Sequence, residues 1–124
     1  MGINSCIFCG NLVEDPLIQR SKTGYTYTKF TLAVNTQIYD KNSNSYVSTA
    51  TFIPCIAYDE IARYIVDNTK KGMKIEITSV LEQSMYKDNK GTTKKEFIFR
   101  INDIDIYREN AEEQKQKWHS KNWF

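Results

Sequence analysis

The chain has 124 residues, of which 40% are hydrophobic and 26% charged, a composition typical of one folded domain and unlike that of a disordered segment. Its 17 Lys and Arg against 15 Asp and Glu give a formal net charge of +2, which excludes little. No apolar run approaches the ~20 residues that span a membrane, and Met1–Ser5 lacks the basic and apolar regions of a signal peptide. We therefore expect a soluble cytoplasmic protein with no membrane partner.

The first strand is expected from Ile3 to Leu12. Gly10 interrupts this run, and a glycine inside a strand marks a bulge or a tight bend of the kind that a small barrel needs. Asp15-Pro16 breaks the pattern, since proline disfavours helix in the residue before it.

Cys6 and Cys9 form a C-x-x-C, which with Cys55 and His119 offers four ligands for zinc. However, strand positions three apart point to opposite faces, and a second closely spaced ligand pair is lacking. A redox C-x-x-C starts a helix, which Gly10-Asn11 does not favour. We interpret the cysteines as small buried strand residues in a reducing compartment, and expect neither a metal nor another cofactor.

The second strand is expected from Tyr25 to Thr36, where apolar residues alternate. The residues that should face the core are Phe30, Leu32 and Val34. The opposite face is aromatic at one end and basic in the middle, and carries Tyr25, Tyr27, Lys29 and Thr31. The polar run 40–45 predicts a turn, and so a long hairpin into the next strand.

The third strand is expected from Tyr46 to Tyr58, and both of its faces are apolar towards the end. One face, with Ile53, Cys55 and Ala57, can close a core. The other carries Phe52, Ile56 and Tyr58. Pro54 has no backbone N–H to donate, so this part of the strand should lie at a sheet edge or a bulge.

A helix is expected from Glu60 to about Asn68, with Asp59 as its N-cap and Gly72 ending it. The fourth strand should run from Met73 to Tyr86, and 87–91 should form a hairpin turn. The fifth strand should run from Thr93 to Tyr107. Its apolar residues change parity between Ile101 and Ile104, which predicts one bulge near Asn102. Residues 108–124 are polar apart from three aromatic residues, and we expect a flexible tail with at most a short helix.

Three strands, one helix and two strands is the element order of an OB-fold, an all-β, five-stranded Greek-key barrel with its helix between strands three and four. We therefore expect one domain over residues 1–107, followed by the tail. A β-sandwich would need about seven strands.

The sequence also resembles a known family, the bacterial and phage single-stranded DNA-binding proteins. Gly10-Asn11-Leu12 with Asp15-Pro16 looks like the opening motif of that family, and Phe30–Asn35 looks like its second-strand signature. Lys71-Gly72, and later Tyr86–Gly91, resemble the start of its fourth strand and the following hairpin. The resemblance covers about Ile3 to Tyr107, and it implies an OB-fold homo-oligomer, either a tetramer or a dimer, that wraps single-stranded DNA with little sequence preference.

The resemblance further implies base-stacking positions, which in this chain match Phe52, Tyr58 and Tyr86. A further stacking aromatic of the family aligns with Ile38, next to Tyr39. Cellular members typically end in an acidic tip that recruits replication and recombination proteins, whereas this chain ends in Phe124 after several lysines.

The residue types fit such binding. Aromatic rings stack on any base, and Lys and Arg neutralise phosphates. Eight basic residues against four acidic ones fall in 70–100, as expected of a surface that faces a polyanion. The expected contacts are Phe52, Tyr58, Tyr86, Tyr27 and Tyr39 for bases, and Lys29, Lys74, Lys87, Lys94 and Lys95 for phosphates. The alternatives are a core position for Phe52, a turn-flanking surface position for Tyr86, and plain solubility for the lysines.

Catalysis has little support, because His119 has no second titratable group placed beside it by the sequence. The carboxylates Glu14-Asp15 and Asp103/Asp105 would suit a metal-dependent nuclease, but an edge of solvated charge explains them as well. We therefore interpret the chain as a non-enzymatic protein that coats single-stranded DNA during replication, recombination and repair. The alternatives are an OB-fold primosome or recombination accessory protein that acts mainly through protein contacts, and the nuclease.

Overall fold

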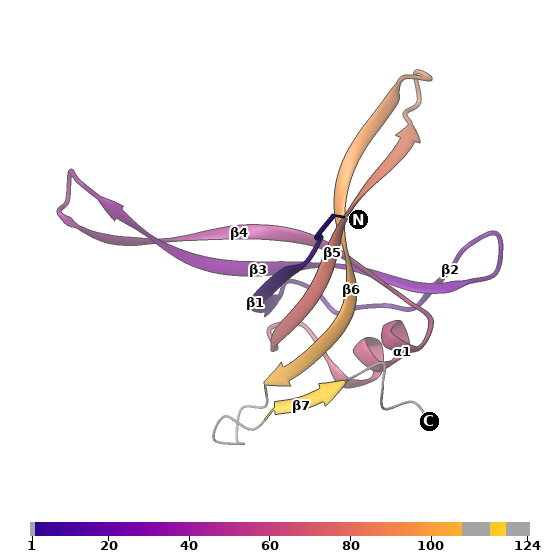
Figure 1. Ribbon diagram of the computed structural model, residues 1–124, viewed down its shortest axis with the longest axis horizontal. Coiled ribbons are helices and arrows are strands. Elements are labelled where there is room, and N and C mark those ends of the chain that lie inside the picture. Colours follow the sequence, from indigo (N-terminus) through magenta and orange to yellow (C-terminus); the bar gives the residue numbers. More distant parts are fainter. Residues whose placement is uncertain (1, 108–114, 119–124) are drawn as a thin grey trace.

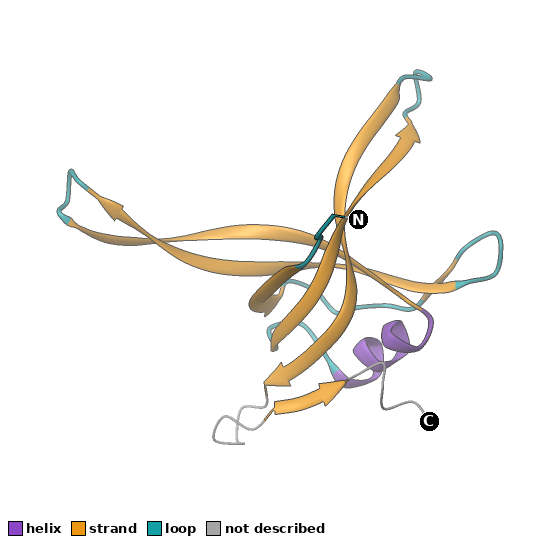
Figure 2. Ribbon diagram, viewed as in Figure 1, coloured by secondary structure: helices purple, strands orange, loops and turns teal. Residues whose placement is uncertain are grey.

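The computed structural model describes residues 2–107 and 115–118, which form strands and one helix (Figures 1 and 2). The elements in chain order are β1 (Cys6–Leu12), β2 (Gln19–Arg20), β3 (Thr26–Asp40), β4 (Ser45–Tyr58), α1 (Asp59–Asn68), β5 (Lys74–Lys87), β6 (Thr93–Tyr107) and β7 (Lys115–Trp118). Among the described residues, no helix is long and apolar enough to cross a membrane.

Five of the strands close into a barrel. Their order is β1-β5-β6-β4-β3, and β1 returns to pair with β3 through Asn11 opposite Ala33 and Leu12 opposite Leu32. Neighbouring barrel strands are antiparallel except β4 and β6, which pair in parallel at Cys55 opposite Phe99. In chain order the helix lies between β4 and β5, which are the third and fourth barrel strands along the sequence. The predicted OB-fold barrel is confirmed.

Gly10 allows β1 to change partners where the barrel closes. It pairs with Ile75 of β5, and the next residue, Asn11, pairs with both β5 and β3. A Cβ atom built on Gly10 would lie 2.3 Å from the carbonyl oxygen of Ala33, so only glycine allows this approach of two backbones. The register between β1 and β5 is continuous here, so Gly10 marks a close approach at a barrel corner and not a bulge.

The predicted bulge in the last barrel strand is confirmed. Thr78 of β5 pairs with Asp103, and Ser79 pairs with Ile101, which leaves Asn102 as an extra residue in β6. Because of this extra residue, Ile101 and Ile104 are both buried despite their opposite parity.

The core lies inside the barrel and under α1. The alternating residues of β3 and β4 fill it as predicted, since Phe30, Leu32, Ile53 and Cys55 are all buried. The helix packs against β3, β4 and β6 and lies away from the tips of both long hairpins (Figure 1). Its buried side chains are Ile61, Ala62 and Ile65.

The helix ends at Asn68 as predicted, but the predicted N-cap and the predicted stop at Gly72 are both wrong. The N-cap is Tyr58, without a side-chain capping hydrogen bond, and Asp59 is the first helical residue with φ of 53°. The chain turns from strand to helix within one residue, which requires a left-handed conformation that Asp tolerates. At the other end, the backbone N–H and Oγ1 of Thr69 both donate to the carbonyl of Ile65. Gly72 instead directs the chain back to β1, because its N–H donates a hydrogen bond to the carbonyl of Leu12.

Several strand ends differ from the prediction. β1 begins at Cys6 and not at Ile3, although the Asn4 side chain bonds both the N–H and the carbonyl of Leu81. The β3–β4 hairpin extends to Asp40 and projects far from the barrel (Figure 1). Residues near its tip are exposed on both faces, so they lack the apolar alternation that marks a strand. The short strand β2 lacks this alternation too, and was not predicted.

Two further expectations need correction. Only Cys55 is fully buried, while Cys6 and Cys9 are partly exposed on opposite faces of β1. Residues Lys115–Trp118 of the expected flexible tail form β7, which pairs with β6. The rest of the expected tail, with His119 and Phe124, lies outside the described residues.

Candidate nucleic-acid interface

One face of the β3–β4 hairpin carries most of the predicted contact residues. Residues directly opposite each other in an antiparallel ladder share a face, and Tyr27 lies opposite Tyr58, Lys29 opposite Ile56 and Ala33 opposite Phe52. We call this the stripe face, and its members are Tyr27, Lys29, Thr31, Ala33 and Tyr39 of β3 and Tyr46, Phe52, Pro54, Ile56 and Tyr58 of β4. The structure therefore brings Tyr27, Lys29, Tyr39, Phe52 and Tyr58 onto one surface.

Tyr39, and not Ile38, supplies the aromatic ring near the hairpin tip. Ile38 pairs with Val47 on the opposite face. The ring of Tyr39 packs edge-on against Tyr46, with 5.3 Å between ring centroids, and its hydroxyl donates to Asn44 Oδ1. Tyr39 is about half exposed and Tyr46 about two thirds exposed, so the tip of the stripe face offers an aromatic pair to a ligand.

Phe52 lies in the middle of the stripe face with 61% of its side chain exposed, so the alternative of a core position is wrong. Pro54 beside it is exposed and widens this surface. The β4–β6 pairing starts only at Cys55, so Pro54 has a neighbouring strand on one side, as an edge position requires. Ile56 is buried.

Three tyrosines gather at the barrel end of the stripe face. Tyr25, just before β3, has its ring centroid 5.8 Å from that of Tyr27 and 5.6 Å from that of Tyr58. Burial raises the pKa of the Tyr58 hydroxyl, and Tyr25 and Glu82 raise it further. The hydroxyl therefore stays protonated at neutral pH and can donate a hydrogen bond. Tyr25 was not among the predicted contacts, although its spacing of two residues from Tyr27 placed it on this face.

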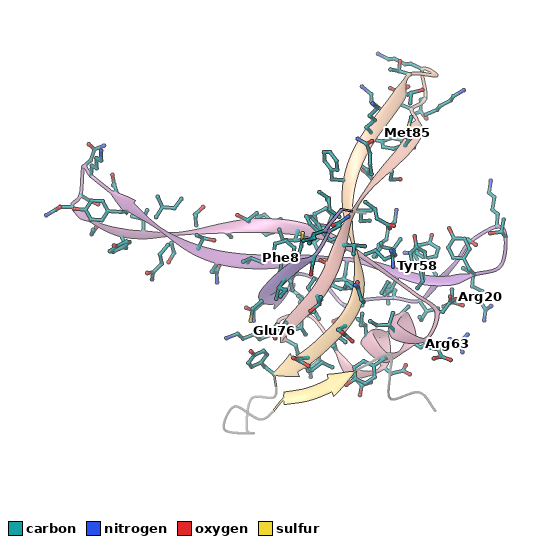
Figure 3. All side chains as sticks on the ribbon, in the orientation of Figure 1. Phe8, Arg20, Tyr58, Arg63, Glu76 and Met85 are labelled. Atoms are coloured by element: carbon teal, nitrogen blue, oxygen red, sulfur yellow. The ribbon has the colours of Figure 1, made fainter. Side chains whose placement is uncertain are left out.

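These tyrosines line a hollow between the stripe face and the base of the β5–β6 hairpin. Figure 3 shows Tyr58 near the point where that hairpin leaves the barrel. We call this the tyrosine hollow; its volume is about 370 Å³, and its lining is Tyr25, Tyr27, Lys29, Ile56, Tyr58, Glu82, Gln83, Ser84, Glu96 and Ile98. Ile56 and Ile98 are buried and form an apolar floor.

The β5–β6 hairpin presents one of its two faces to the hollow. Glu82 lies opposite Ile98 and Ser84 opposite Glu96, and two residues further along the same face Tyr86 lies opposite Lys94. Tyr86 is half exposed near the turn. The structure therefore brings Tyr86 and Lys94 to the side of the tyrosine hollow.

Lys87 and Lys95 lie on the other face of this hairpin. Lys95 is opposite Met85, whose side chain Figure 3 shows near the hairpin tip. This second face also carries Leu81 and Phe97, both exposed. Each face of this hairpin thus carries at least one ring and one lysine, and a count of lysines in the sequence does not reveal which lysine lies on which face.

Lys74 lies apart from the other predicted contacts. It starts β5, whereas Lys87 ends it, a separation of roughly 40 Å at ~3.3 Å per residue. Its Nζ lies 5.0 Å from the ring centroid of Tyr107. With Lys70 and Lys71 it lines a second hollow of about 570 Å³. The structure does not bring Lys74 together with Tyr86 and Lys87.

The carboxylates do not assemble into a metal centre. Asp105 is 8% exposed, so the interpretation of solvated charge is wrong for it, and Asp15 accepts the Lys71 backbone N–H at 2.7 Å. Among the described residues, no three His, Cys, Asp or Glu side chains form a group that could hold a metal ion.

Comparison with known proteins agrees with this geometry. The model of the Single-strand binding protein family matches residues 3–107. A single-stranded DNA-binding protein of Fusobacterium nucleatum is 31% identical over 84 residues, covering 68% of this chain and 54% of the relative. Single-stranded DNA-binding protein 2 of Streptomyces coelicolor is 23% identical over 96 residues, covering 77% and 48%. The chain thus spans about half the length of these relatives.

A solved structure shares the fold. It is a Plasmodium falciparum SSB complex with ssDNA, which superposes with a TM-score of 0.75 at 19% identity and covers 87% of this chain and 97% of its own. At this identity the likeness bears on the fold alone, and it agrees with the closed five-stranded barrel.

Proposed function

The chain belongs to the Single-strand binding protein family, and from this we propose that it binds and coats single-stranded DNA in the cytoplasm during replication, recombination and repair. Binding is largely independent of sequence and involves no bond chemistry. The observation that carries the proposal is the stripe face, which continues into the tyrosine hollow at the barrel. Residues 1–107 act as the binding domain, and 108–124 as a short polar extension.

Aromatic rings along the stripe face provide the sequence-independent part of the affinity. Phe52 and Tyr58 are six residues apart on β4, or ~20 Å along an extended strand. Every base has a π-face, and stacking on an aromatic side chain contributes ~1–3 kcal/mol per base. A single strand that follows the stripe face from Tyr39 past Phe52 to Tyr58 meets successive rings.

Phosphates meet the lysines beside these rings. Lys29 lies on the stripe face, and Lys94 lies opposite Tyr86. Lys and Arg that neutralise phosphates release condensed counterions, so the affinity should fall with salt. Lys87 and Lys95 contact single-stranded DNA that crosses the tip of the β5–β6 hairpin. Lys74 contacts DNA that continues around the far end of the barrel.

Family membership supports a homo-oligomer, either a tetramer or a dimer. In the part of the chain that the structure describes, residues Cys6–Gly10 of β1 pair with β5 only. One edge of this segment can therefore accept another strand.

Titration with fluorescein-labelled oligo(dT), followed by anisotropy and by quenching of the protein's intrinsic fluorescence, tests the proposal. Light scattering with and without oligo(dT) reports the assembly. Tight, stoichiometric binding with intact DNA in the presence of Mg²⁺ is the expected result. Weak binding to oligo(dT) would overturn the proposal, and cleavage of the oligonucleotide would favour the nuclease.

A further inference from the structure

The tyrosine hollow differs from the rest of the stripe face because it contains two carboxylates. Tyr25, Tyr27 and Tyr58 form one wall, and Glu82 and Glu96 stand on the β5–β6 side. An acidic side chain is unexpected on a surface that binds a polyanion, because it repels phosphate. The carboxylates therefore need an explanation that a backbone-binding surface does not supply.

The shape and lining of the hollow favour a base over a phosphate. Its floor consists of the buried side chains of Ile56 and Ile98, and its volume of about 370 Å³ falls in the range of about 300–1,000 Å³ known for small-molecule pockets. A flat base can cover an apolar floor and pack on tyrosine rings. A phosphate needs cations, and Lys29 is the only one in this lining.

The two carboxylates keep acceptor oxygens available. Oε1 of Glu82 pairs with Nε of Arg100 at 3.1 Å, which holds the side chain and leaves its second oxygen to a ligand. The side chain of Glu96 makes no hydrogen bond or ion pair within the described part of the chain. Glu82 raises the pKa of Tyr58 and its partner Arg100 lowers it, so both members of this ion pair lie close enough to act on the Tyr58 hydroxyl.

Ionised carboxylates only accept hydrogen bonds, and bases differ in what they donate. Cytosine and adenine carry an exocyclic amino group, and guanine carries an amino group on its minor-groove edge. Thymine has no amino group, and its single donor, N3–H, lies between the acceptors O2 and O4, which a carboxylate repels. The pairing of Glu with the cytosine amino group is a known mode of base discrimination.

We propose that Glu82 and Glu96 make the tyrosine hollow a base subsite that selects bases with an exocyclic amino group over thymine. This subsite gives an otherwise sequence-tolerant surface one position of base preference. The inference rests on the proposed binding of single-stranded DNA and deepens it.

The test compares affinities for oligo(dC) and oligo(dT) of equal length, at one salt concentration, for the wild type and the variants E82Q, E96Q and the double variant. Glu96 has no partner to lose, so E96Q should fold normally, and far-UV circular dichroism checks each variant. The matched control is E14Q, because Glu14 is exposed and does not line the hollow.

Neutralising both carboxylates should lower the preference for oligo(dC) relative to oligo(dT) by about fivefold, which corresponds to ~1 kcal/mol, the lower end of a base-specific contact. E96Q alone should move the ratio in the same direction, and E14Q should leave it unchanged. Equal strengthening of binding to both oligonucleotides would show simple relief of repulsion and would overturn the inference while leaving the proposed function intact. Binding of neither oligonucleotide by the wild type would overturn the proposed function and the subsite with it.

Discussion

Tyr86 of β5 and Lys94 of β6 lie directly opposite each other, so a ring and a cation share the face of the hairpin that leads to the tyrosine hollow. Lys95, one residue further along, lies opposite Met85 on the other face. Two adjacent lysines with the same sequence environment thus occupy different surfaces, and they should contribute differently to binding.

The substitution K94Q should lower the salt dependence of single-stranded DNA binding more than K95Q does. Each phosphate contact on a single strand contributes about 0.7 to the slope of log affinity against log salt concentration. Titrations with oligo(dT) at several salt concentrations measure this slope. Equal slopes for the two variants would show that both lysines neutralise phosphate to the same extent and would contradict the predicted difference between the two faces.

Removal of the rings of Phe52 and Tyr86 should weaken binding without unfolding the barrel. Each ring is half exposed or more, so the substitution to Ala removes little core packing. The loss of each ring should weaken the binding free energy by ~1–3 kcal/mol per stacked base, which anisotropy with labelled oligo(dT) measures. The control is F97A, since Phe97 is 59% exposed but lies opposite Gln83 on the other face of its hairpin. A folded double variant with wild-type affinity would exclude stacking on these rings.

The barrel could be predicted from the sequence because its determinants are local. Alternation in β3 and β4 identified the core faces, and the change of parity between Ile101 and Ile104 located the bulge at Asn102. The N-cap of α1 could not be predicted, because the tight turn after Tyr58 placed Asp59 inside the helix as a left-handed residue. Such a turn depends on the path of the neighbouring strands and leaves no pattern in composition.

The candidate site was predicted in part. The period of two along β3 and β4 placed Tyr27, Phe52 and Tyr58 on one face, and the structure agrees. Lys74 was grouped with Tyr86 although they lie at opposite ends of β5, since charge counted along a segment carries no information on position. Glu82 and Glu96 could not be found from the sequence, because their meeting with the tyrosines depends on how two hairpins cross.

Cys55 should make the stability fall at high pH. Burial raises the pKa of its thiol from 9.0 to about 12, and the side chain is 1% exposed. Above pH 9 the unfolded chain loses a proton that the folded chain keeps, so the free energy of unfolding falls by about 1.4 kcal/mol per pH unit until the folded pKa is reached. Below pH 9 this contribution is constant.

Urea unfolding of the wild type and C55A between pH 7 and 10 measures this effect, since the other titrating groups are common to both proteins. The difference in stability between them should shrink as the pH rises above 9. C9A is the control, because Cys9 is partly exposed, and it should keep the decline. A pH-independent difference between the wild type and C55A would contradict the predicted linkage.

Deletion of Asn102 should leave a folded barrel, whereas deletion of Asp105 should prevent folding. Without the extra residue, β6 alternates regularly, and Ile101 and Ile104 still share the core face. Without Asp105, Ile104 and Ile106 become successive residues on opposite faces, so one buried isoleucine leaves the core. This loss costs about 2–5 kcal/mol, and a small domain has only about 5–15 kcal/mol in total. Circular dichroism and thermal melting distinguish the two variants, and loss of cooperative melting on deletion of Asn102 would show that the barrel needs the bulge itself.

The substitution G10A should destabilise the barrel where β1 closes it. The added methyl group would lie 2.3 Å from the Ala33 carbonyl oxygen and 2.9 Å from its carbon, and both atoms belong to backbone that is paired in the sheet. Overpacking of this kind costs about 1–3 kcal/mol or more, measured as a lower urea midpoint at unchanged slope. G2A adds the same methyl group where nothing lies within 4 Å, so it should melt like the wild type. A stable G10A would mean that β1 can move away from β3 at little cost, and the barrel would then be open at this seam in solution.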